Sequence, residues 1–170
     1  MTPGNPVEDL PIEVIGIDHL YIAVSDMARA ETFYDKVFAV LGFRKNRFGL
    51  NGEAHVQYYN RHFGYVLRPA RTNQAHDAYA PGLHHFCFRV GTPAEVERLA
   101  HRLNALGIEA SQPRLYPDYA PDYVATFFTD PDGIRLEVTN YREERRQRHD
   151  HWNDLSDALP EPCCTHKEGR

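Results

Sequence analysis

The sequence predicts an α+β fold in which two similar βαβββ modules form a curved mixed sheet with the shape of a cup. Three observations predict this fold: a strand-like segment that occurs twice, a helical pattern that follows each copy and ends at a glycine, and room for three short strands after each glycine. Two small sheets of this kind must pack or curl around a common centre, because each has an apolar face to cover.

The repeated segment is IDHLYIAV at residues 17–24 and LHHFCFRV at residues 83–90. Both copies alternate in character and are rich in β-branched or aromatic residues, which is typical of strands. Their apolar residues coincide position by position: Leu20 with Phe86, Ile22 with Phe88, and Val24 with Val90.

A helix is expected after each copy. Ser25 and Asp26 can cap a helix over residues 27–40, and Thr92 can cap a second helix in which Pro93 suits the first position. Each helix ends at a Leu-Gly pair, where glycine easily takes a left-handed conformation. The expected apolar stripes are Phe33, Val37 and Val40 or Leu41 in the first helix, and Val96, Leu99, Leu103 and Leu106 in the second.

Three short strands are expected after each helix. They lie at residues 43–48, 55–60 and 63–68 in the first half, and at 109–115, 124–129 and 134–140 in the second. The last pair is joined by Asp130-Pro131-Asp132-Gly133, whose proline and glycine favour a tight turn. Residues 69–81 read as a linker between the halves.

These signals divide the chain into an N-terminal extension at residues 1–14, one domain at 15–141 with modules 15–70 and 82–141, and a charged tail at 142–170. Residues 141–152 are expected to form a solvated helix. The cluster Cys163-Cys164-Thr165-His166 near the end of the tail lacks the second pair of ligands that a zinc site needs, so we expect no site there.

The bulk composition excludes several classes of protein. A formal net charge of −5 gives no electrostatic reason to bind nucleic acid or an anionic membrane surface. No apolar run approaches the length of a membrane-spanning helix, and the first residues lack the features of a secretion signal. Three cysteines are too few for a disulfide framework. We therefore expect a cytoplasmic protein whose partner is a small molecule.

Three side chains are expected to converge on one spot. Strand alternation places His19 and His85 at matching positions of the repeat, on the face opposite the helix, and it turns Glu137 to the same side of the last strand. Two imidazoles and one carboxylate leave positions open for water or substrate, which suits a catalytic iron(II), manganese, zinc, nickel or cobalt ion. The alternative interpretation is that the histidines pair with neighbouring groups in the strands and that Glu137 is a surface residue.

These segments also resemble a known family. Ile17-Asp18-His19-Leu20, Gly82-Leu83-His84-His85-Phe86 and Asp130-Pro131-Asp132-Gly133-Ile134-Arg135-Leu136-Glu137 resemble the landmark strands of the vicinal oxygen chelate superfamily, which contains glyoxalases, bleomycin-resistance proteins and extradiol dioxygenases. The resemblance covers residues 15–141. It implies one divalent metal held at His19, His85 and Glu137, and a substrate that chelates the metal through two adjacent oxygens.

One departure from the family pattern is expected. Glyoxalase I enzymes usually supply a fourth ligand from the last strand of the first half, and alignment of the modules places Arg68, or Leu67 with a slip of one residue, opposite Glu137. Neither residue is a carboxylate. The chain therefore looks more like the three-ligand branch, which contains ring-cleaving dioxygenases and fosfomycin-modifying enzymes.

Further residues are candidates for catalysis or specificity. Tyr123 can point into the cup and donate a proton, Arg68 can grip an anionic group of the substrate, and His55 has the chemistry of a base. Each has a structural alternative: a packing tyrosine, an ion pair and a strand histidine. Cys87 is expected to be a buried thiol, and the aromatic and proline-rich residues 116–123 are expected to form a loop over the mouth of the cup.

The sequence thus predicts a metal-dependent enzyme that performs lyase or isomerase chemistry, or extradiol-type oxygen insertion, on a small substrate. The alternative is a non-catalytic protein that sequesters a small molecule, such as an antibiotic, without metal. By analogy with the family we expect a homodimer.

Overall fold

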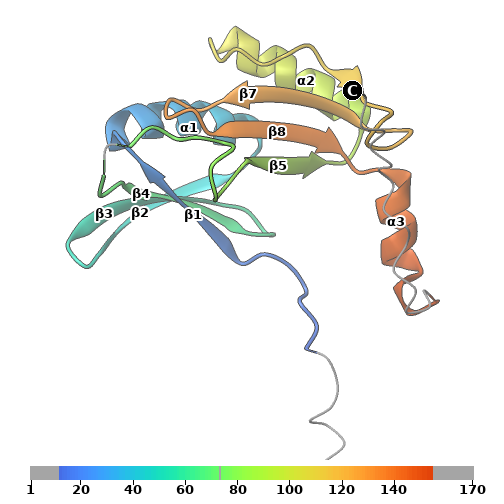
Figure 1. Cartoon of the computed structure of the whole chain (residues 1–170), viewed down its shortest axis with the longest axis horizontal. Helices are drawn as coiled ribbons and strands as arrows, with labels where there is room; N and C mark the ends of the chain where they lie inside the picture. The colour runs from blue at the N-terminus through green and yellow to red at the C-terminus, as the bar shows by residue number, and fades with distance from the viewer. Residues whose placement is uncertain (1–11, 73, 155–170) are drawn as a thin grey trace, which may run out of the picture.

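The computed structural model describes residues 12–72 and 74–154, which form eight β-strands, three α-helices and one 3₁₀ helix (Figure 1). The first module consists of β1 (His19–Val24), α1 (Met27–Val40), β2 (Arg44–Leu50), β3 (Glu53–Tyr59) and β4 (Gly64–Pro69). The second consists of β5 (His85–Val90), α2 (Pro93–Ala105), β6 (Arg114–Leu115), β7 (Val124–Thr129) and β8 (Arg135–Asn140), and α3 (Glu143–Asp150) and η1 (Trp152–Asp154) follow it. The predicted α+β fold of two βαβββ modules is confirmed.

Each module forms its own four-stranded mixed sheet. The strand orders are β1-β4-β3-β2 and β5-β8-β7-β6, and in both sheets the first strand of the module is parallel to the last. Within residues 12–72 and 74–154 no strand pairing joins the two sheets, so β1 and β5 each keep one unpaired edge. The expected cup is therefore split, in one chain, into two separate sheets.

Helix α1 occupies the residues that the sequence predicts. The side chain of Asp26 caps it by accepting a hydrogen bond from the backbone N–H of Arg29. After the helix, Gly42 takes a positive φ of 74°, which a residue with a side chain rarely adopts. Val37 is buried as expected, but the largest buried side chains of α1 are Tyr34 and Phe38, which the predicted stripe omits.

Helix α2 begins with a complete capping box between Thr92 and Glu95. Three of its four predicted apolar residues are buried: Val96, Leu99 and Leu103. The prediction was wrong for Leu106, which follows the helix and is 42% exposed, whereas Ala100 is buried in its place.

Strand β6 is much shorter than expected, because residues 109–113 do not pair as a strand. The Ser111 side chain accepts a hydrogen bond from the Phe127 backbone N–H, and the Ser111 backbone N–H donates to the Phe127 carbonyl oxygen. Pro113 then interrupts the segment, since proline has no N–H to donate to a ladder. Before β6, the segment at residues 109–113 is thus joined to β7 by the hydrogen bonds of Ser111 and not by strand pairing.

The two modules share one hydrophobic core. The rings of Phe86 and Phe88 in β5 contact Tyr65 in β4, with ring centroids 5.9 and 6.2 Å apart, and Phe38 of α1 packs edge-on against Phe88. These are residues of the helix-side faces of both sheets. Because these faces meet each other, the opposite faces, which carry His19 in one sheet and His85 in the other, are turned outward.

The turn at Asp130-Pro131-Asp132-Gly133 fastens the second module to α1 of the first. Asp130 is buried and accepts a hydrogen bond from the Tyr34 hydroxyl at 2.9 Å. Asp132 accepts hydrogen bonds from the Ser25 backbone N–H and from the Arg29 guanidinium, both at 2.8 Å. The predicted tight turn therefore also joins the two modules through hydrogen bonds.

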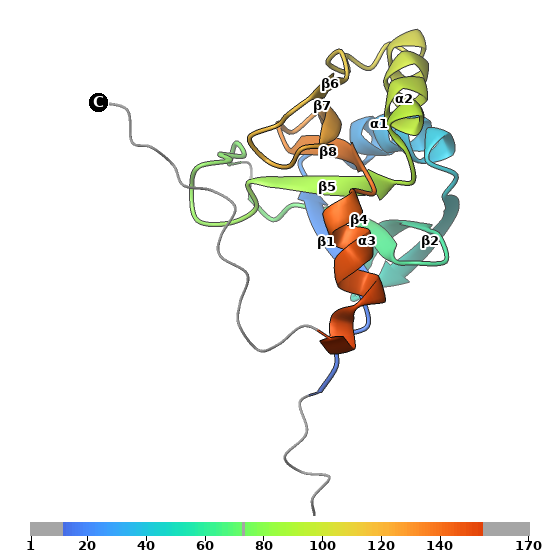
Figure 2. The same ribbon diagram turned by 90° about the vertical axis from the view of Figure 1, so that its right-hand side faces the viewer.

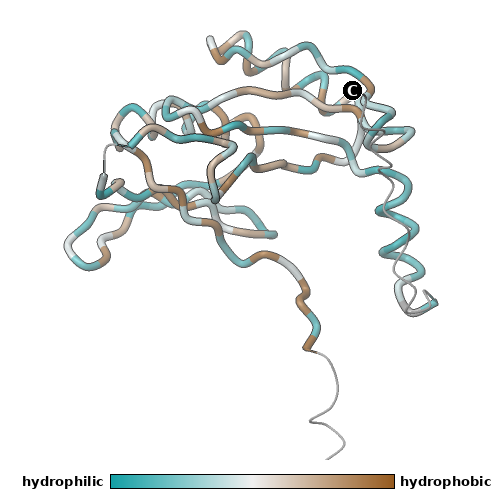
Figure 3. Tube along the Cα trace, in the orientation of Figure 1, coloured by the Kyte–Doolittle hydropathy of each residue, from teal (hydrophilic) through white to brown (hydrophobic). Residues whose placement is uncertain are grey.

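Two segments extend from this body on the same side of the molecule (Figure 1, Figure 2). Helix α3, the predicted solvated helix, has no buried residue and is hydrophilic along its length (Figure 3). The segment before β1 is apolar and highly exposed, notably at Ile12, Val14 and Ile15. In the part of the chain that the structure describes, no helix is long and apolar enough to cross a membrane. The cluster Cys163-Cys164-Thr165-His166 lies outside the described residues.

Candidate metal centre

His85 and Glu137 meet on the outward face of the second sheet. Register pairs Cys87 with Glu137, so the side chains of His85, Cys87 and Glu137 lie on one face, as strand alternation predicts. The Nε2 atom of His85 lies 3.2 Å from Oε2 of Glu137. The glutamate side chain is only 4% exposed, whereas the imidazole is 38% exposed, so the pair has a buried carboxylate and an accessible imidazole nitrogen.

Tyr123 completes the surroundings of Glu137. Its hydroxyl donates a hydrogen bond of 2.7 Å to Oε1 of the glutamate, so Tyr123 points to the face of the second sheet that carries Glu137. Burial, and next the hydrogen bond to Glu137, raise the pKa of the Tyr123 phenol, which therefore keeps its proton at neutral pH. Burial and the nearby Glu137 carboxylate likewise raise the pKa of the Cys87 thiol to about 12, so the thiol is neutral.

His19 lies apart from this pair in the single chain. It is the first residue of β1, and among the described residues no three His, Cys, Asp or Glu side chains gather closely enough to hold an ion. Its Nδ1 atom lies 2.6 Å from a carboxylate oxygen of Asp18. A carboxylate at Nδ1 fixes the tautomer that leaves the lone pair of Nε2 free for a metal. The strand pattern did not predict this contact, although Asp18 is the residue next to His19.

The register of the first sheet corrects the expected position of a fourth ligand. His19 pairs with Gly64 and Tyr21 with Val66, as His85 pairs with Arg135 and Cys87 with Glu137. The counterpart of Glu137 is therefore Val66. The predicted alignment with Glu137 was wrong: Arg68 lies two residues beyond Val66, and Leu67 lies one residue beyond it. A shift of a strand by two residues leaves the same side chains on the same face, so the alternation of apolar residues alone could not exclude the position of Arg68. Val66 offers no ligand atom, so the position still lacks a carboxylate.

Arg68 and His55 lie on the same outward face of the first sheet as His19. Arg68 forms an ion pair with Glu53, and its side chain is 29% exposed. His55 is buried, its ring stacks on Phe48 with centroids 5.0 Å apart, and Nδ1 lies 3.0 Å from the carbonyl oxygen of Glu53. Both residues thus have the structural partners that the alternative interpretation expects.

The residues of the second sheet fit a divalent ion by their donor chemistry. A carboxylate withdrawn from water needs a compensating positive charge, yet the neutral Tyr123 hydroxyl and the His85 ring are its observed polar partners. Oxygen and imidazole nitrogen are the ligands of catalytic manganese, iron and zinc sites. His85 and Glu137 therefore fit two positions of a three-ligand site.

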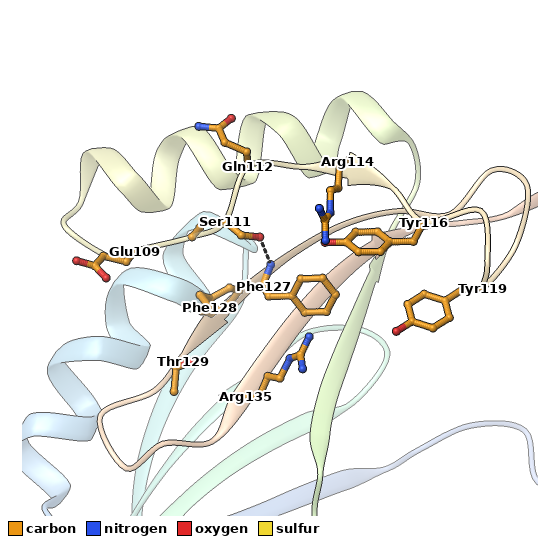
Figure 4. Close-up of a pocket in the computed structure, with 11 residues that line it drawn as sticks. Glu109, Ser111, Gln112, Arg114, Tyr116, Tyr119, Phe127, Phe128, Thr129 and Arg135 are labelled. Atoms are coloured by element: carbon orange, nitrogen blue, oxygen red, sulfur yellow. Dashed lines mark hydrogen bonds between the residues drawn. The ribbon is translucent and has the colours of Figure 1, made fainter. Parts of the chain in front are cut away.

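An open cavity of about 850 Å³ lies over the second sheet (Figure 4), and it is lined by Phe127, the register partner of Glu137. Arg114, Tyr116, Phe127 and Arg135 line it, together with Tyr119 from the loop at residues 116–123. That loop was expected over the mouth of a cup, and it borders this cavity. Arg114, Phe127 and Arg135 were not predicted from the sequence as site residues. The available signal was strand phase, since Arg135 alternates with Leu136 as Glu137 does.

Solved structures share this architecture. The chain is similar to a glyoxylase/bleomycin resistance protein/dioxygenase domain from Frankia sp. EAN1pec, with 21% identity and a TM-score of 0.63 over 76% of this chain and all of that one. It is similar to lactoylglutathione lyase from Agrobacterium tumefaciens, with 27% identity and a TM-score of 0.55 over 77% of this chain and 96% of that one. It is also similar to the fosfomycin resistance protein FosX from Listeria monocytogenes in complex with Mn(II) and a sulfate ion, with 18% identity and a TM-score of 0.55 over 79% of this chain and 98% of that one.

A family model matches most of the domain. It describes the glyoxalase/bleomycin resistance protein/dioxygenase superfamily and matches residues 16–138, which contain the first module, the second module as far as the middle of β8, and the residues His19, His85 and Glu137. The protein therefore belongs to the glyoxalase/bleomycin resistance protein/dioxygenase superfamily.

Proposed function

We propose that this protein is a metal-dependent enzyme that acts on a small molecule chelated through two adjacent oxygens, with one divalent ion held by His19, His85 and Glu137. The observation that carries the proposal is the 3.2 Å approach of His85 Nε2 to the buried Glu137 carboxylate. A carboxylate that is withdrawn from water is stabilised by a nearby cation, and a divalent ion bound to both Glu137 and the accessible His85 nitrogen would supply that charge.

A second copy of the chain supplies His19 in this proposal. Three features support it: His19 and the His85–Glu137 pair lie on outward faces of different sheets, β1 and β5 each have an unpaired edge, and exposed apolar residues precede β1. Unpaired edges are sites where strands of another chain can add. If β1 of one copy pairs with β5 of the other, the same contact forms twice around a twofold axis and closes a dimer.

The bound ion would supply Lewis acidity, which stabilises negative charge that develops on the substrate oxygens. The chain's own groups hold the proton and orient the substrate. The Tyr123 phenol, which keeps its proton, is the proposed proton donor beside Glu137. Arg68 and His55 are proposed to face the substrate from the first sheet, since they share the face of His19.

The reaction type is either lyase or isomerase chemistry or extradiol-type oxygen insertion. The similarity to lactoylglutathione lyase at 27% identity supports the first. Two histidines and one carboxylate with open positions support the second if the ion is iron(II). Aerobic assays of the iron(II) protein with catechols, and assays with a hemithioacetal, separate the two reactions.

Metal analysis tests the proposal. The wild-type protein should retain about one ion per chain, and His19→Ala, His85→Ala and Glu137→Ala should each lose it, since catalytic sites with three protein ligands depend on all of them. The control is His101→Ala, which removes an exposed histidine of α2. Retention of the ion in all three ligand variants would refute the assignment. A wild-type chain without affinity for Mn(II), Fe(II), Zn(II), Ni(II) or Co(II) would instead favour a protein that sequesters its ligand without metal.

A further inference from the structure

A continuous series of aromatic rings and guanidinium groups lines the cavity over the second sheet (Figure 4). The guanidinium carbon of Arg135 lies 4.4 Å from the centroid of the Phe127 ring. The Tyr116 ring stands edge-on to Phe127 with centroids 5.5 Å apart, and the guanidinium carbon of Arg114 lies 4.7 Å from the Tyr116 centroid. Two cations thus flank a pair of rings on one side of the sheet.

Neither arginine has a carboxylate partner among the described residues. In residues 12–72 and 74–154, no acidic side chain lies within ion-pair distance of Arg114 or Arg135, whereas Arg29, Arg68 and Arg98 each have one. The chain as a whole has more acidic than basic residues, 24 against 19, so carboxylates are not scarce. Of the described residues that line the cavity, only Glu109 is acidic, and it lies at the far end from Arg114 (Figure 4). The cavity between the arginines therefore favours an anion.

This cavity adjoins the proposed metal ligands. Phe127 is the register partner of Glu137, and Arg135 is the register partner of His85. Partners on neighbouring strands are separated by about 5 Å and point to the same face. A ligand of modest size that covers Phe127 thus lies next to the His85–Glu137 pair.

We infer that this cavity is a substrate subsite for a small aromatic carboxylate, with the ring packed on Phe127 and Tyr116 and the carboxylate held by Arg114 and Arg135. A flat ring suits the aromatic wall, and a guanidinium matches a carboxylate with two parallel hydrogen bonds. Ligand pockets of about 300–1,000 Å³ hold small organic molecules, and this cavity of about 850 Å³ lies in that range. As a statement about substrate, the inference rests on the proposed function; as a statement about binding, it can be tested alone.

The test is binding of benzoate, measured by ligand-detected saturation-transfer NMR and by titration of the backbone amide signals of Phe127 and Arg135. Benzamide, the neutral analogue, and cyclohexanecarboxylate, which lacks the aromatic ring, serve as comparison ligands. We expect benzoate to bind about tenfold or more tightly than benzamide, because a hydrogen bond to a charged group is lost in the amide. Arg135→Ala and Arg114→Ala should each weaken benzoate binding by about tenfold or more, and Arg135→Lys should recover part of the loss.

Arg98→Ala is the matched control, since Arg98 is an exposed arginine of α2 on another surface. Unchanged melting temperatures should show that the exposed Arg114 and Arg135 can be removed without unfolding. Equal affinity for benzoate and benzamide, or benzoate binding that survives the double variant Arg114→Ala/Arg135→Ala, would overturn the inference.

The two proposals fail separately. His19→Ala should lose metal but keep benzoate binding, because His19 belongs to the other sheet. Arginine-dependent benzoate binding in a chain that takes up no metal would leave the subsite in place and remove the proposed enzyme. Metal uptake without benzoate binding would leave the proposed metal-dependent enzyme in place and overturn the subsite.

Discussion

At the scale of single residues, Asp130 combines burial with a full set of partners. Its side chain accepts hydrogen bonds from the backbone N–H groups of Asp132 and Ile134 and from the Tyr34 hydroxyl, which in turn contacts the Tyr65 hydroxyl. Burial nevertheless raises the pKa of Asp130 above its ordinary value of 3.8. The charged carboxylate is thus held at a cost, and the hydrogen bonds offset part of it.

The raised pKa of Asp130 predicts how the stability of an Asp130→Asn variant depends on pH. A carboxyl whose folded-state pKa is raised contributes stability that is fully present below the unfolded value of 3.8 and is lost as pH rises through the folded value. Asparagine does not titrate and keeps one oxygen acceptor. The free energy of unfolding of Asp130→Asn, relative to wild type, should therefore rise between about pH 3 and pH 7, as measured by urea unfolding at several pH values.

Two comparisons make that measurement decisive. Asp130→Ala should lose about 1–3 kcal/mol at acid pH, because three hydrogen-bond donors lose their acceptor, and this loss should shrink as pH rises, since alanine does not titrate either. Asp118→Asn, at an exposed residue of the loop, should give a flat difference. A flat difference for Asp130→Asn as well would contradict the raised pKa.

At the scale of elements, the sequence predicted the bounds of the helices, because residues next to each helix determine where it begins and ends. The bounds of α1 follow from a capping side chain and a glycine, and those of α2 from a capping box and Pro93, so both helices were placed within a residue. The stripe of α1 was less accurate, because Tyr34 and Phe38 are buried by the other module rather than by their own sheet alone. The predicted length of β6 was wrong for a related reason, because the contacts of Ser111 with Phe127 come from tertiary structure.

The capping box of α2 gives a prediction at this scale. Thr92→Ala removes the acceptor of the Glu95 backbone N–H, although Glu95 can still reach the backbone N–H of residue 92. The free energy of unfolding should fall by about 1 kcal/mol, while Thr92→Ser should be close to wild type. Thermal unfolding followed by circular dichroism measures this, with Thr72→Ala in the exposed linker as the control. An equal loss for alanine and serine at position 92 would show that the methyl group, not the cap, is what matters.

At the scale of the whole molecule, the sequence assigned the faces of the strands but not the relation between the modules. His85 and Glu137 were placed together because both positions follow from alternation within one sheet. The separation of His19 from them depends on how Phe86 and Phe88 pack against Tyr65, which no local pattern encodes. The repeat therefore predicts two half-sites, and only tertiary structure says whether one chain joins them.

Mixing of two inactive variants tests whether two chains share a centre. His19→Ala and Glu137→Ala alone should bind no metal at the centre. In a heterodimer, however, the intact His19 of one chain meets the intact His85 and Glu137 of the other, so one of the two centres is complete. Random pairing after joint refolding should recover about a quarter of the wild-type metal content. Recovery of none would place the whole centre within one chain.

His19 and the His85–Glu137 pair lie on outward faces of different sheets, and the proposal that two chains share a metal centre therefore has a consequence for how activity depends on protein concentration. When neither chain alone holds all three ligands, the fraction of complete centres depends on protein concentration, and it falls as a sample is diluted below the dimer dissociation constant. Specific activity would then decline in dilute assays although every molecule stays folded. A cell that makes half as much of such a protein would lose more than half of its catalytic capacity.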